Sequence, residues 1–496
     1  MNKRAYVKAV GLAGVGAISG TSPLSAPGAE TIQRPNIIFI LTDDQRWDAM
    51  SCLGHPFLKT PNMDRIRREG ALFKNAFVTT SLCSPARASF LTGAYAHSHG
   101  VIGNWGCEFD HEETPSFPRV LKDAGYETAF VGKWHMGKNA RPRPGFDYWL
   151  SFRGQGVYTD PTLNENGREF HAKGYITDLL TDYAVQYITK ERQKPFCLYL
   201  SHKAVHSPFT PAPRHAGDFT DAPLPQPPNT HDTFAGKPAW LRGGPAYSKG
   251  QNDGATVPDS TPPQQWDPTE VRRRGYLRTI AAVDDGIGRI FKTLEERGEL
   301  DRTIIMFAGD NGYFHGEHAR GDKRLMYEES IRIPLIMRYP PAVKPNSTVD
   351  QMALNIDVAP TLLDLAGVPA PVSMQGRSMV PLLEGETDGW RASFLYEYWM
   401  DLTDRVPRML GVRTEGWKLI RYPDIDDIDE MYDLKNDPYE MTNLALDPNY
   451  AGKRERLSLE LDRLMKETGY GAKPIPQSPV VRRLAAREKR QTVGPQ

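Results

Sequence analysis

A cysteine stands beside a predicted helix N-terminus in residues 81–93, Ser-Leu-Cys-Ser-Pro-Ala-Arg-Ala-Ser-Phe-Leu-Thr-Gly. Ser84 can serve as the N-cap, Pro85 suits the first helical position, and the final glycine ends the helix. Cys83 then lies just ahead of the helix, where unpaired N–H groups and the positive end of the helix dipole favour an anion. Arg87, one turn later, adds a guanidinium to the same place. A small buried thiol beside a surface arginine explains most lone cysteines, but it does not explain an anion-attracting neighbourhood.

Two pairs of oxygen-bearing side chains follow two apolar runs of the sequence. Asp43 and Asp44 end one run, and Asp310 and Asn311 follow another. Ligands that are all oxygen select Ca²⁺ or Mg²⁺ over zinc or copper. Adjacent acids at a strand end are often only turn formers, so either pair alone favours a structural role. Both pairs together with the cysteine segment predict a divalent metal site.

Apolar runs that end in polar residues recur along the chain and define its fold class. In open α/β sheets, ligands bind at the carboxyl ends of the strands, so these polar residues are expected to converge. Predicted helices between the runs indicate a doubly wound sheet with helices on both faces. The predicted strands are 34–44, 128–131, 196–201 and 303–308, and the clearest helices are 58–70 and 267–297, the second capped by Asp267.

Composition excludes several classes of partner. Lys+Arg and Asp+Glu each number 61, so no basic surplus favours nucleic acid or an anionic membrane. An anionic substrate must therefore be met by a local cluster of cations. Cys52, Cys83, Cys107 and Cys197 show no zinc-site spacing, and we expect no disulfide on which the fold depends.

Residues 1–29 resemble a signal peptide and predict export to the periplasm or the medium. A basic start precedes a short apolar run with small residues at the predicted cleavage point. The run is shorter than the roughly 20 residues that cross a bilayer, and no later segment is long enough, so we expect no stable membrane span. The alternative is an N-terminal tail without regular structure.

Domain organisation follows from the change of composition in the last quarter of the chain. We predict a catalytic α/β domain at 30–380, a C-terminal α+β subdomain at 381–472 and a poorly ordered tail at 473–496. The Pro- and Gly-rich segment 206–268 is either a loop at the mouth of the site or a surface insertion.

Two of these segments together resemble a known enzyme family. Residues 83–87 match the Cys-x-Pro-x-Arg motif of the type I, formylglycine-dependent sulfatases, and residues 125–135, Gly-Tyr-Glu-Thr-Ala-Phe-Val-Gly-Lys-Trp-His, match the second motif of that family. The resemblance extends over nearly the whole chain after the signal peptide. It implies an alkaline-phosphatase-like fold, with a mixed, mostly parallel sheet between helices and a smaller C-terminal domain containing an antiparallel sheet.

The resemblance also implies a cofactor set. A formylglycine-generating maturase would oxidise Cys83 to an aldehyde, whose hydrate is the nucleophile. One divalent ion, Ca²⁺ or alternatively Mg²⁺, would neutralise sulfate oxygens and lower the pKa of the hydrate. The implied metal ligands are Asp43, Asp44, Cys83 as formylglycine, Asp310 and Asn311.

Roles for the remaining residues follow from the same resemblance. The hydrate of residue 83 attacks sulfur while Lys133 and Lys323 hold the sulfate oxygens, and Arg87 orients residue 83. His206 or Lys323 protonates the departing sugar oxygen, and His135 then takes a proton from the second hydroxyl so that sulfate leaves.

Three assignments carry nearby competitors. His206 is preferred to His202 because His206-x-Pro208 keeps the family pattern, although Val205 stands where a proline is common. Lys323 is preferred to Arg324 because of its spacing before Tyr327-Glu328. His315 and His318 are interpreted as exposed loop histidines without a role, with substrate contact as the alternative.

The substrate class comes from subgroup resemblance. Segments 154–158, 323–329 and 396–399 look most like bacterial N-acetylglucosamine-6-sulfatase relatives, which implies a 6-O-sulfated glucosamine in glycosaminoglycan or mucin glycans. The alternatives are a phosphodiester or phosphonate monoester hydrolase of the same superfamily, and a glycan-binding protein whose cysteine is never activated. Every catalytic position is filled, which argues against the binding protein.

Overall fold

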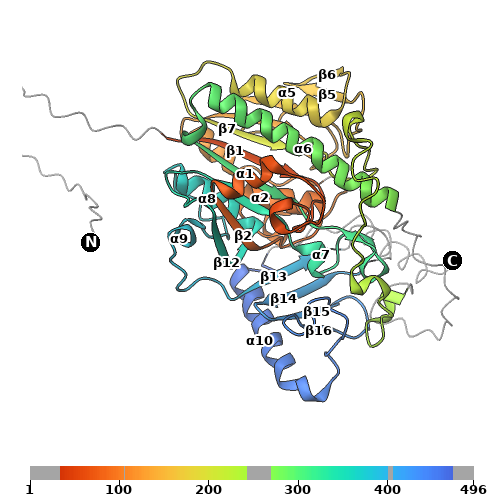
Figure 1. Cartoon of the computed structure of the whole chain (residues 1–496). Coiled ribbons are helices and arrows are strands. Elements are labelled where there is room, and N and C mark those ends of the chain that lie inside the picture. The colour runs from red at the N-terminus through yellow and green to blue at the C-terminus, as the bar shows by residue number, and fades with distance from the viewer. Residues whose placement is uncertain (1–33, 106, 243–269, 400–405, 473–496) are drawn as a thin grey trace, which may run out of the picture. The chain divides into compact units, whose positions relative to one another are not determined.

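The computed structural model describes residues 34–105, 107–242, 270–399 and 406–472 (Figure 1). The predicted signal peptide (1–29), the predicted tail (473–496) and the predicted helix cap Asp267 lie outside the described residues. None of the helices in these ranges is both long and apolar enough to cross a membrane.

A ten-stranded mixed sheet forms the framework, in the order β12-β2-β11-β8-β1-β7-β3-β4-β5-β6. The four runs predicted as strands are its parallel centre: β8 (Thr303–Gly309), β1 (Asn36–Thr42), β7 (Phe196–Ser201) and β3 (Glu127–Gly132). The other strands are β12 (Ser347–Leu354), β2 (Ala71–Phe77), β11 (Leu335–Arg338), β4 (Tyr148–Ser151), β5 (Thr162–Glu165) and β6 (Arg168–His171), of which β11, β5 and β6 run antiparallel to their neighbours.

Helices cover both faces of this sheet, which explains why the central strands are mostly apolar and are buried at nearly every position. Ile38 and Ile40 of β1 pack in one core with helices α1 (Pro61–Arg68), α5 (Ile176–Ile188) and α6 (Glu270–Glu296) (Figure 1). Phe39 of the same strand packs in the opposite core with α2 (Cys83–Thr92), α4 (Phe117–Asp123) and α8 (Val358–Leu365). Short helices α3 (Ala96–His99), α7 (Glu328–Ile331) and α9 (Val380–Leu383) follow α2, α6 and α8 in the chain.

The helix predicted from residue 58 begins three residues later, at Pro61. Proline favours the first helical position, and the Asp284 carboxylate of α6 accepts the backbone N–H of Met63 at 2.8 Å. A residue 221 positions away therefore caps this helix, which no local pattern could show.

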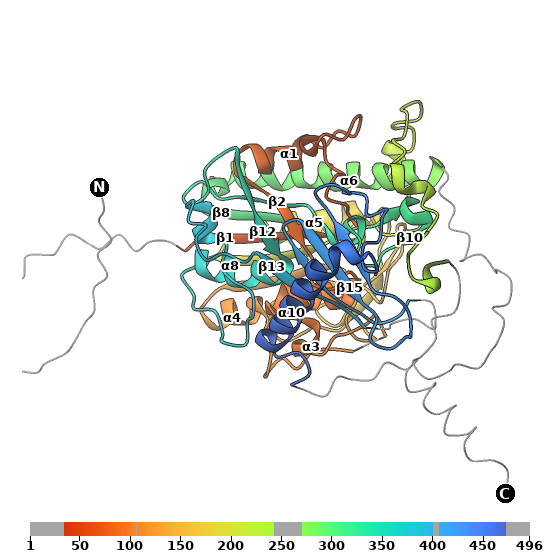
Figure 2. The same ribbon diagram turned by 90° about the horizontal axis from the view of Figure 1, so that it is seen from below.

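A second, antiparallel sheet contains β13 (Ser393–Tyr398), β14 (Met409–Thr414), β15 (Trp417–Arg421) and β16 (Glu430–Asp433). Helix α10 (Ala451–Thr468) packs across β13, β14 and β15 (Figure 2). The sheet joins the main one through β13, where the backbone N–H of Glu397 donates to Thr79 O at 3.0 Å. The predicted α+β arrangement is confirmed, whereas the domain boundary near residue 380 stays a prediction.

The described part of segment 206–268 contains three 3₁₀ helices, η2 (Pro213–His215), η3 (Pro228–His231) and η4 (Ala239–Arg242). In η3, Asn229 donates to Glu329 at 2.7 Å, so this segment packs on α7, which follows the loop that carries Lys323. The remaining short elements are η1 (Ser51–Leu53), η5 (Leu300–Arg302), β9 (Phe314–His315), η6 (Glu317–Ala319), β10 (Gly321–Asp322), η7 (Asn355–Asp357) and η9 (Pro448–Tyr450).

Candidate active site

The residues predicted to do chemistry meet at the carboxyl edge of the central strands. Each strand contributes side chains from the loop at its carboxyl end, and α2 and the loop after β10 contribute the rest. The structure brings together Asp43 and Asp44 after β1, Lys133 and His135 after β3, His206 after β7, Asp310 and Asn311 after β8, Cys83 and Arg87 on α2, and Lys323 between β10 and α7.

The cysteine helix starts earlier than predicted. Cys83 is its first residue and Leu82, in an extended conformation, is the N-cap, so Ser84 as N-cap is wrong. The N–H of Ser84 is satisfied instead by Asn104 Oδ1 at 3.0 Å, and the Ser84 hydroxyl donates to His135 O at 2.5 Å. Cys83 therefore lies in the first helical turn, still at the positive end of the helix dipole. Gly93 ends the helix in the left-handed region, as predicted.

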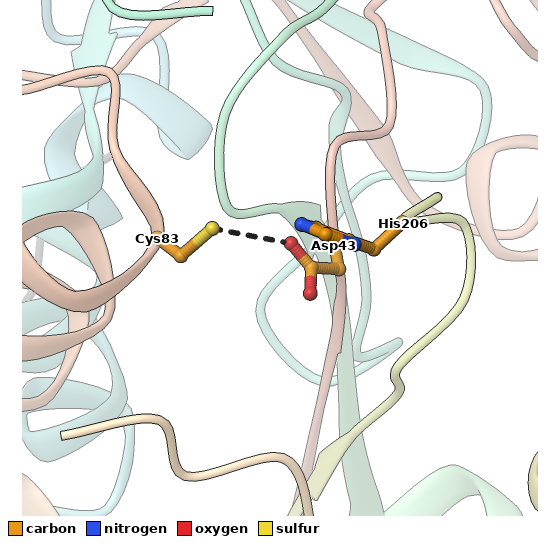
Figure 3. A group of neighbouring side chains, drawn as sticks. All are labelled: Asp43, Cys83 and His206. Carbon is orange, nitrogen blue, oxygen red and sulfur yellow. Dashed lines mark hydrogen bonds between the residues drawn. The ribbon is translucent and has the colours of Figure 1, made fainter. Parts of the chain in front are cut away.

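The Cys83 thiol points at the Asp43 carboxylate, and the His206 imidazole lies beside that carboxylate (Figure 3). The distance from Cys83 Sγ to Asp43 Oδ1 is 3.5 Å. Burial, reinforced by the charge of Asp43, raises the pKa of the Cys83 thiol to about 12. An unmodified Cys83 is therefore a neutral thiol at physiological pH and a poor nucleophile.

Four oxygen-bearing side chains fit a hard divalent cation. One oxygen each from Asp43, Asp44 and Asp310 lies within 4.8 Å of the others. Asn311 Nδ2 donates to Asp44 Oδ1 at 2.7 Å, and its buried Oδ1 has no hydrogen-bond partner among the described residues. Burial and the neighbouring Asp43 raise the pKa of Asp310 to about 7. Crowded carboxylates with an unsatisfied oxygen beside them are the ligand set that Ca²⁺ or Mg²⁺ prefers.

Cations surround these carboxylates. Lys133 Nζ donates to Asp43 Oδ2, and Lys323 Nζ lies 2.5 and 2.8 Å from the two oxygens of Asp44. Burial alone raises the pKa of Asp43, but Lys133, with His206 and Arg87, outweighs it and holds that pKa well below its ordinary value. These ammonium groups stand where an anion would be bound.

Arg87 is 1% exposed and is no surface arginine. Its Nε donates to Asp310 Oδ2 at 2.9 Å, and its Nη1 donates to Lys133 O at 2.9 Å and to Ser201 Oγ at 2.6 Å. One guanidinium thus ties the cysteine helix to β8, β3 and β7. Arg324, the competitor of Lys323, pairs with Asp322 instead.

The two histidines at the site have different partners: His206 contacts a backbone carbonyl and His135 contacts the Ser84 hydroxyl. His206 Nδ1 lies 2.9 Å from Ser207 O, and a carbonyl only accepts, so Nδ1 carries the proton. His206 Nε2 faces Asp44 Oδ2 at 3.8 Å. His135, with φ 59°, lies half-buried against Ser84, and burial together with Lys133 holds its pKa well below the ordinary value.

The competing histidines lie elsewhere. His202 is buried, and the charge of Asp178 acts on its imidazole. Asp178 belongs to α5, which covers the face of the sheet opposite α2. The expectation that His318 is exposed is wrong: it is fully buried, 2.6 Å from Asp232 and stacked on Tyr327. His315 is half-buried. Both belong to the packing around the Lys323 loop.

Sequence reasoning assigned no role to three residues that contact the site. Gln155 Oε1 accepts from Lys133 Nζ, and the buried Lys203 ammonium lies 4.7 Å over the ring of Tyr158. The Tyr276 hydroxyl of α6 donates to Asp44 O at 2.9 Å and accepts the N–H of Arg46 at 2.8 Å. Lys203 comes just after a strand end, which is a usable signal, whereas Tyr276 is 232 positions from its partner and gives none.

Comparison with known proteins places this geometry in a family. The sulfatase family profile matches residues 35–368, and a profile described as N-sulphoglucosamine sulphohydrolase, C-terminal, matches residues 316–467. An N-acetylglucosamine-6-O-sulfatase of Bacteroides thetaiotaomicron is 38% identical and aligns over 89% of this chain and 88% of its own length. The human N-acetylglucosamine-6-sulfatase is 31% identical, over 85% of this chain and 83% of its own.

A solved structure gives the same result. A protein in complex with its substrate D-glucosamine-2-N,6-O-disulfate superimposes with a TM-score of 0.80 at 37% identity, covering 88% of this chain and 99% of that one. The predicted fold class and the resemblance are confirmed by these matches. The chain belongs to the sulfatase family and is related to N-acetylglucosamine-6-sulfatases.

Proposed function

We propose that this enzyme removes sulfate from a carbohydrate, and that its substrates are 6-O-sulfated N-acetylglucosamine or glucosamine units of glycosaminoglycan or mucin glycans. The observation that carries the sulfatase chemistry is the Cys83 thiol, 3.5 Å from Asp43 at the helix N-terminus, within a ring of carboxylates and cations. The sugar and the position of the sulfate are supported by the names of the relatives and by the disulfated glucosamine bound to the related structure.

The absent groups would supply the nucleophile and part of the charge. A formylglycine made from Cys83 by a maturase would provide a hydrated aldehyde as nucleophile, and a divalent ion, Ca²⁺ by its oxygen ligands, would neutralise negative charge on the sulfate. Asp43, Asp44, Asp310 and Asn311 would hold the ion together with residue 83.

The chain's own residues do the remaining work in this proposal. Lys133 and Lys323 exchange their carboxylate partners for sulfate oxygens, and Arg87 keeps α2 fixed on Asp310. The leaving sugar oxygen takes a proton from Lys323, whose ammonium already carries one, or from His206 through Nε2 when the imidazole is doubly protonated, because Nδ1 keeps its own proton on Ser207 O. His135, beside the first turn of α2, accepts a proton at residue 83 when sulfate leaves.

One experiment tests the chemistry and its alternatives together. Protein from the native host, or co-expressed with a maturase, is digested, and the peptide with residue 83 is weighed for loss of the thiol and gain of an aldehyde. The same sample is assayed on an aryl sulfate, an aryl phosphonate monoester and N-acetylglucosamine-6-sulfate. We expect the aldehyde and preference for sulfate. An unmodified thiol in protein from the native host indicates the glycan-binding alternative, and preference for the phosphonate indicates the other hydrolase.

We also propose that the protein is exported, to the periplasm or the medium. The basic start and short apolar run of residues 1–29 support this. N-terminal sequencing of the mature protein from its host tests it: a start near residue 30 is expected, and a start at Met1 contradicts it.

A further inference from the structure

The segment Gly154–Tyr158 lies between β4 and β5 and contacts two site residues, each of which follows a different strand. Gln155 Oε1 accepts from Lys133 Nζ, and the Tyr158 hydroxyl donates to His206 O at 2.6 Å. Lys133 follows β3 and His206 follows β7. Five consecutive residues therefore reach both a predicted sulfate-binding cation and a predicted proton carrier.

At one end of the segment, Gln155 shares the ammonium of Lys133 with Asp43. An ammonium only donates, so Gln155 must present its carbonyl oxygen to Lys133. Lys133 is 1% exposed, and Gln155 and Asp43 Oδ2 are the two side-chain acceptors that its Nζ contacts. When Asp43 binds a metal ion, Gln155 is the acceptor that remains, and it is neutral, so it orients Lys133 without cancelling its charge.

At the other end, Tyr158 fixes the backbone that carries the His206 imidazole. Lys203 Nζ lies 3.3 Å from Ser207 O, the carbonyl that also faces His206 Nδ1. The Lys203 ammonium lies over the ring of Tyr158, which is 4% exposed. Two successive carbonyls, those of residues 206 and 207, are thus held from one side, and His206 Nε2 is directed at Asp44.

The backbone of the segment explains how one turn serves both ends. Gly154 and Gly156 have φ of 55° and 64°, which favours glycine, and a Cβ on Gly156 would lie 2.5 Å from the ring of Phe152. Val157, between the two contacts, is 54% exposed and supports neither. Gln155 and Tyr158 are therefore held on either side of a glycine-dependent turn.

We propose that Gly154–Tyr158 is a two-ended positioning element, in which Gln155 orients the sulfate-binding ammonium of Lys133 and Tyr158 orients the imidazole of His206. Both act through another residue and are positioning residues. The inference rests on the proposed function, in which Lys133 binds sulfate and His206 assists the leaving group. It adds that the two tasks are controlled from one segment and can be disturbed separately.

The test uses the full-length, formylglycine-containing enzyme and three readouts. These are the inhibition constant for inorganic sulfate, kcat and KM for 4-nitrophenyl sulfate, whose leaving group is good, and kcat and KM for N-acetylglucosamine-6-sulfate, whose leaving group is poor. Gln155→Leu removes the acceptor of Lys133. It is expected to raise the sulfate inhibition constant about tenfold and to lower kcat/KM for both esters by one common factor.

Tyr158→Phe removes only the hydroxyl and keeps the ring. It is expected to leave the sulfate inhibition constant unchanged and to lower kcat for the sugar ester about tenfold, with little effect on the nitrophenyl ester, which needs no proton donor. Tyr175→Phe is the matched control, because its hydroxyl donates to Thr210 O at 2.9 Å and its ring stacks on Tyr158. Among the described residues, no hydrogen bond or ring contact joins its side chain to a site residue. This variant should leave all three readouts at wild-type values.

The outcomes separate this inference from the proposed function. The two-ended element is overturned if Gln155→Leu and Tyr158→Phe change the three readouts in the same way. It is also overturned if both variants behave like the control Tyr175→Phe. Wild-type enzyme that hydrolyses no sulfate ester overturns the proposed function instead. If Gln155→Leu does not fold, Gln155→Asn is assayed, because the shorter amide cannot reach Lys133 and must give the same pattern.

Discussion

Two clusters of buried charge lie close together in this protein and are built differently. The carboxylate site consists of Asp43, Asp44, Asp310 and Asn311, and the inter-sheet network consists of Glu328, Arg413, Lys418 and Glu440. In the network, Lys418 Nζ lies 3.1 Å from Glu328 and 2.6 Å from Glu440, while Arg413 lies 3.1 Å from Glu328. In the site, three acids crowd within 4.8 Å and the Asn311 oxygen has no partner among the described residues.

This difference indicates that the inter-sheet network stabilises the fold, whereas the carboxylate site is suited to bind a ligand. Each acid of the site also has a cation partner, Lys133, Lys323 or Arg87. The three acids nevertheless lie against one another, and burial with the neighbouring Asp43 raises the pKa of Asp310 to about 7, a repulsion that a metal ion would relieve. The network also supports the site, since Lys418 Nζ donates to Met326 O at 2.5 Å and the Tyr396 hydroxyl donates to Arg324 O at 2.6 Å. The C-terminal sheet therefore holds the backbone just after Lys323 in place through these two hydrogen bonds. Substitutions in the two clusters should have different effects, and the largest is expected at residue 83.

Cys83→Ala should abolish activity and leave the fold intact. The substitution removes the source of the nucleophile, so turnover of any sulfate ester should fall by about 10⁴-fold or more. The thiol contributes one weak contact to Asp43, so the melting temperature should stay near that of the wild type. Initial rates and thermal melts measure the two quantities. A variant that keeps activity contradicts the assignment of residue 83.

Lys418→Met should break the network and unfold the protein more easily. It leaves Glu440 and Glu328 without their shared cation in a buried place, which costs about 3–5 kcal/mol of unfolding free energy. Burial already raises the pKa of Glu440 to about 8 with Lys418 present, so the loss should be smaller at low pH, where Glu440 is protonated. Denaturant unfolding at pH 5 and pH 8 gives both values. Equal losses at the two pH values would argue against a bare carboxylate as the cause.

Asp310→Asn should have a smaller effect on stability, in the carboxylate site. It removes one of the crowded charges but also the carboxylate partner of the buried Arg87, so metal-free protein should lose only about 1 kcal/mol of unfolding free energy, while bound divalent ion and most activity are lost. Elemental analysis after dialysis and melting with and without a chelator measure these changes. Glu328→Gln is the matched change in the network and should unfold more easily. If Asp310→Asn loses as much unfolding free energy without metal as Glu328→Gln does, the proposed charge crowding is wrong.

The sequence was informative where polar residues directly follow strands, and silent where distant segments meet. The central strands and the convergence of their ends could be predicted. A short apolar run that is buried on both faces indicates a parallel strand, and the carboxyl ends of such strands lie at the same edge of the sheet. The start of the cysteine helix was missed, because Asn104 Oδ1 accepts the N–H of Ser84 from outside the helix, and Ser84 lies inside the helix instead of capping it. Gln155 and Tyr276 were missed because their contacts join segments that only the fold brings together. Sequence patterns describe one element at a time, and these contacts belong to pairs of elements.

A smaller test concerns a histidine that joins α3 to the second sheet. His97 Nδ1 lies 3.0 Å from Glu397 Oε2, and His97 Nε2 lies 2.9 Å from Thr468 O. A carbonyl and a carboxylate both accept, so the ring is best satisfied with both nitrogens protonated. Burial lowers the pKa of His97, but Glu397 outweighs it and the net pKa is raised.

The sign of the pH dependence follows from that direction. A histidine whose pKa is higher in the folded than in the unfolded state stabilises fully below its unfolded pKa, about 6.5, and loses this contribution as pH rises through the folded value. The unfolding free energy of the wild type should therefore fall by about 1–2 kcal/mol between pH 6 and pH 9 from this pair, and His97→Gln should lack that slope. His99→Gln is the control in the same helix, because burial lowers the pKa of His99 to about 3 and it stays neutral over this range. A slope that survives in His97→Gln, or disappears in His99→Gln, would assign the pH dependence to another group.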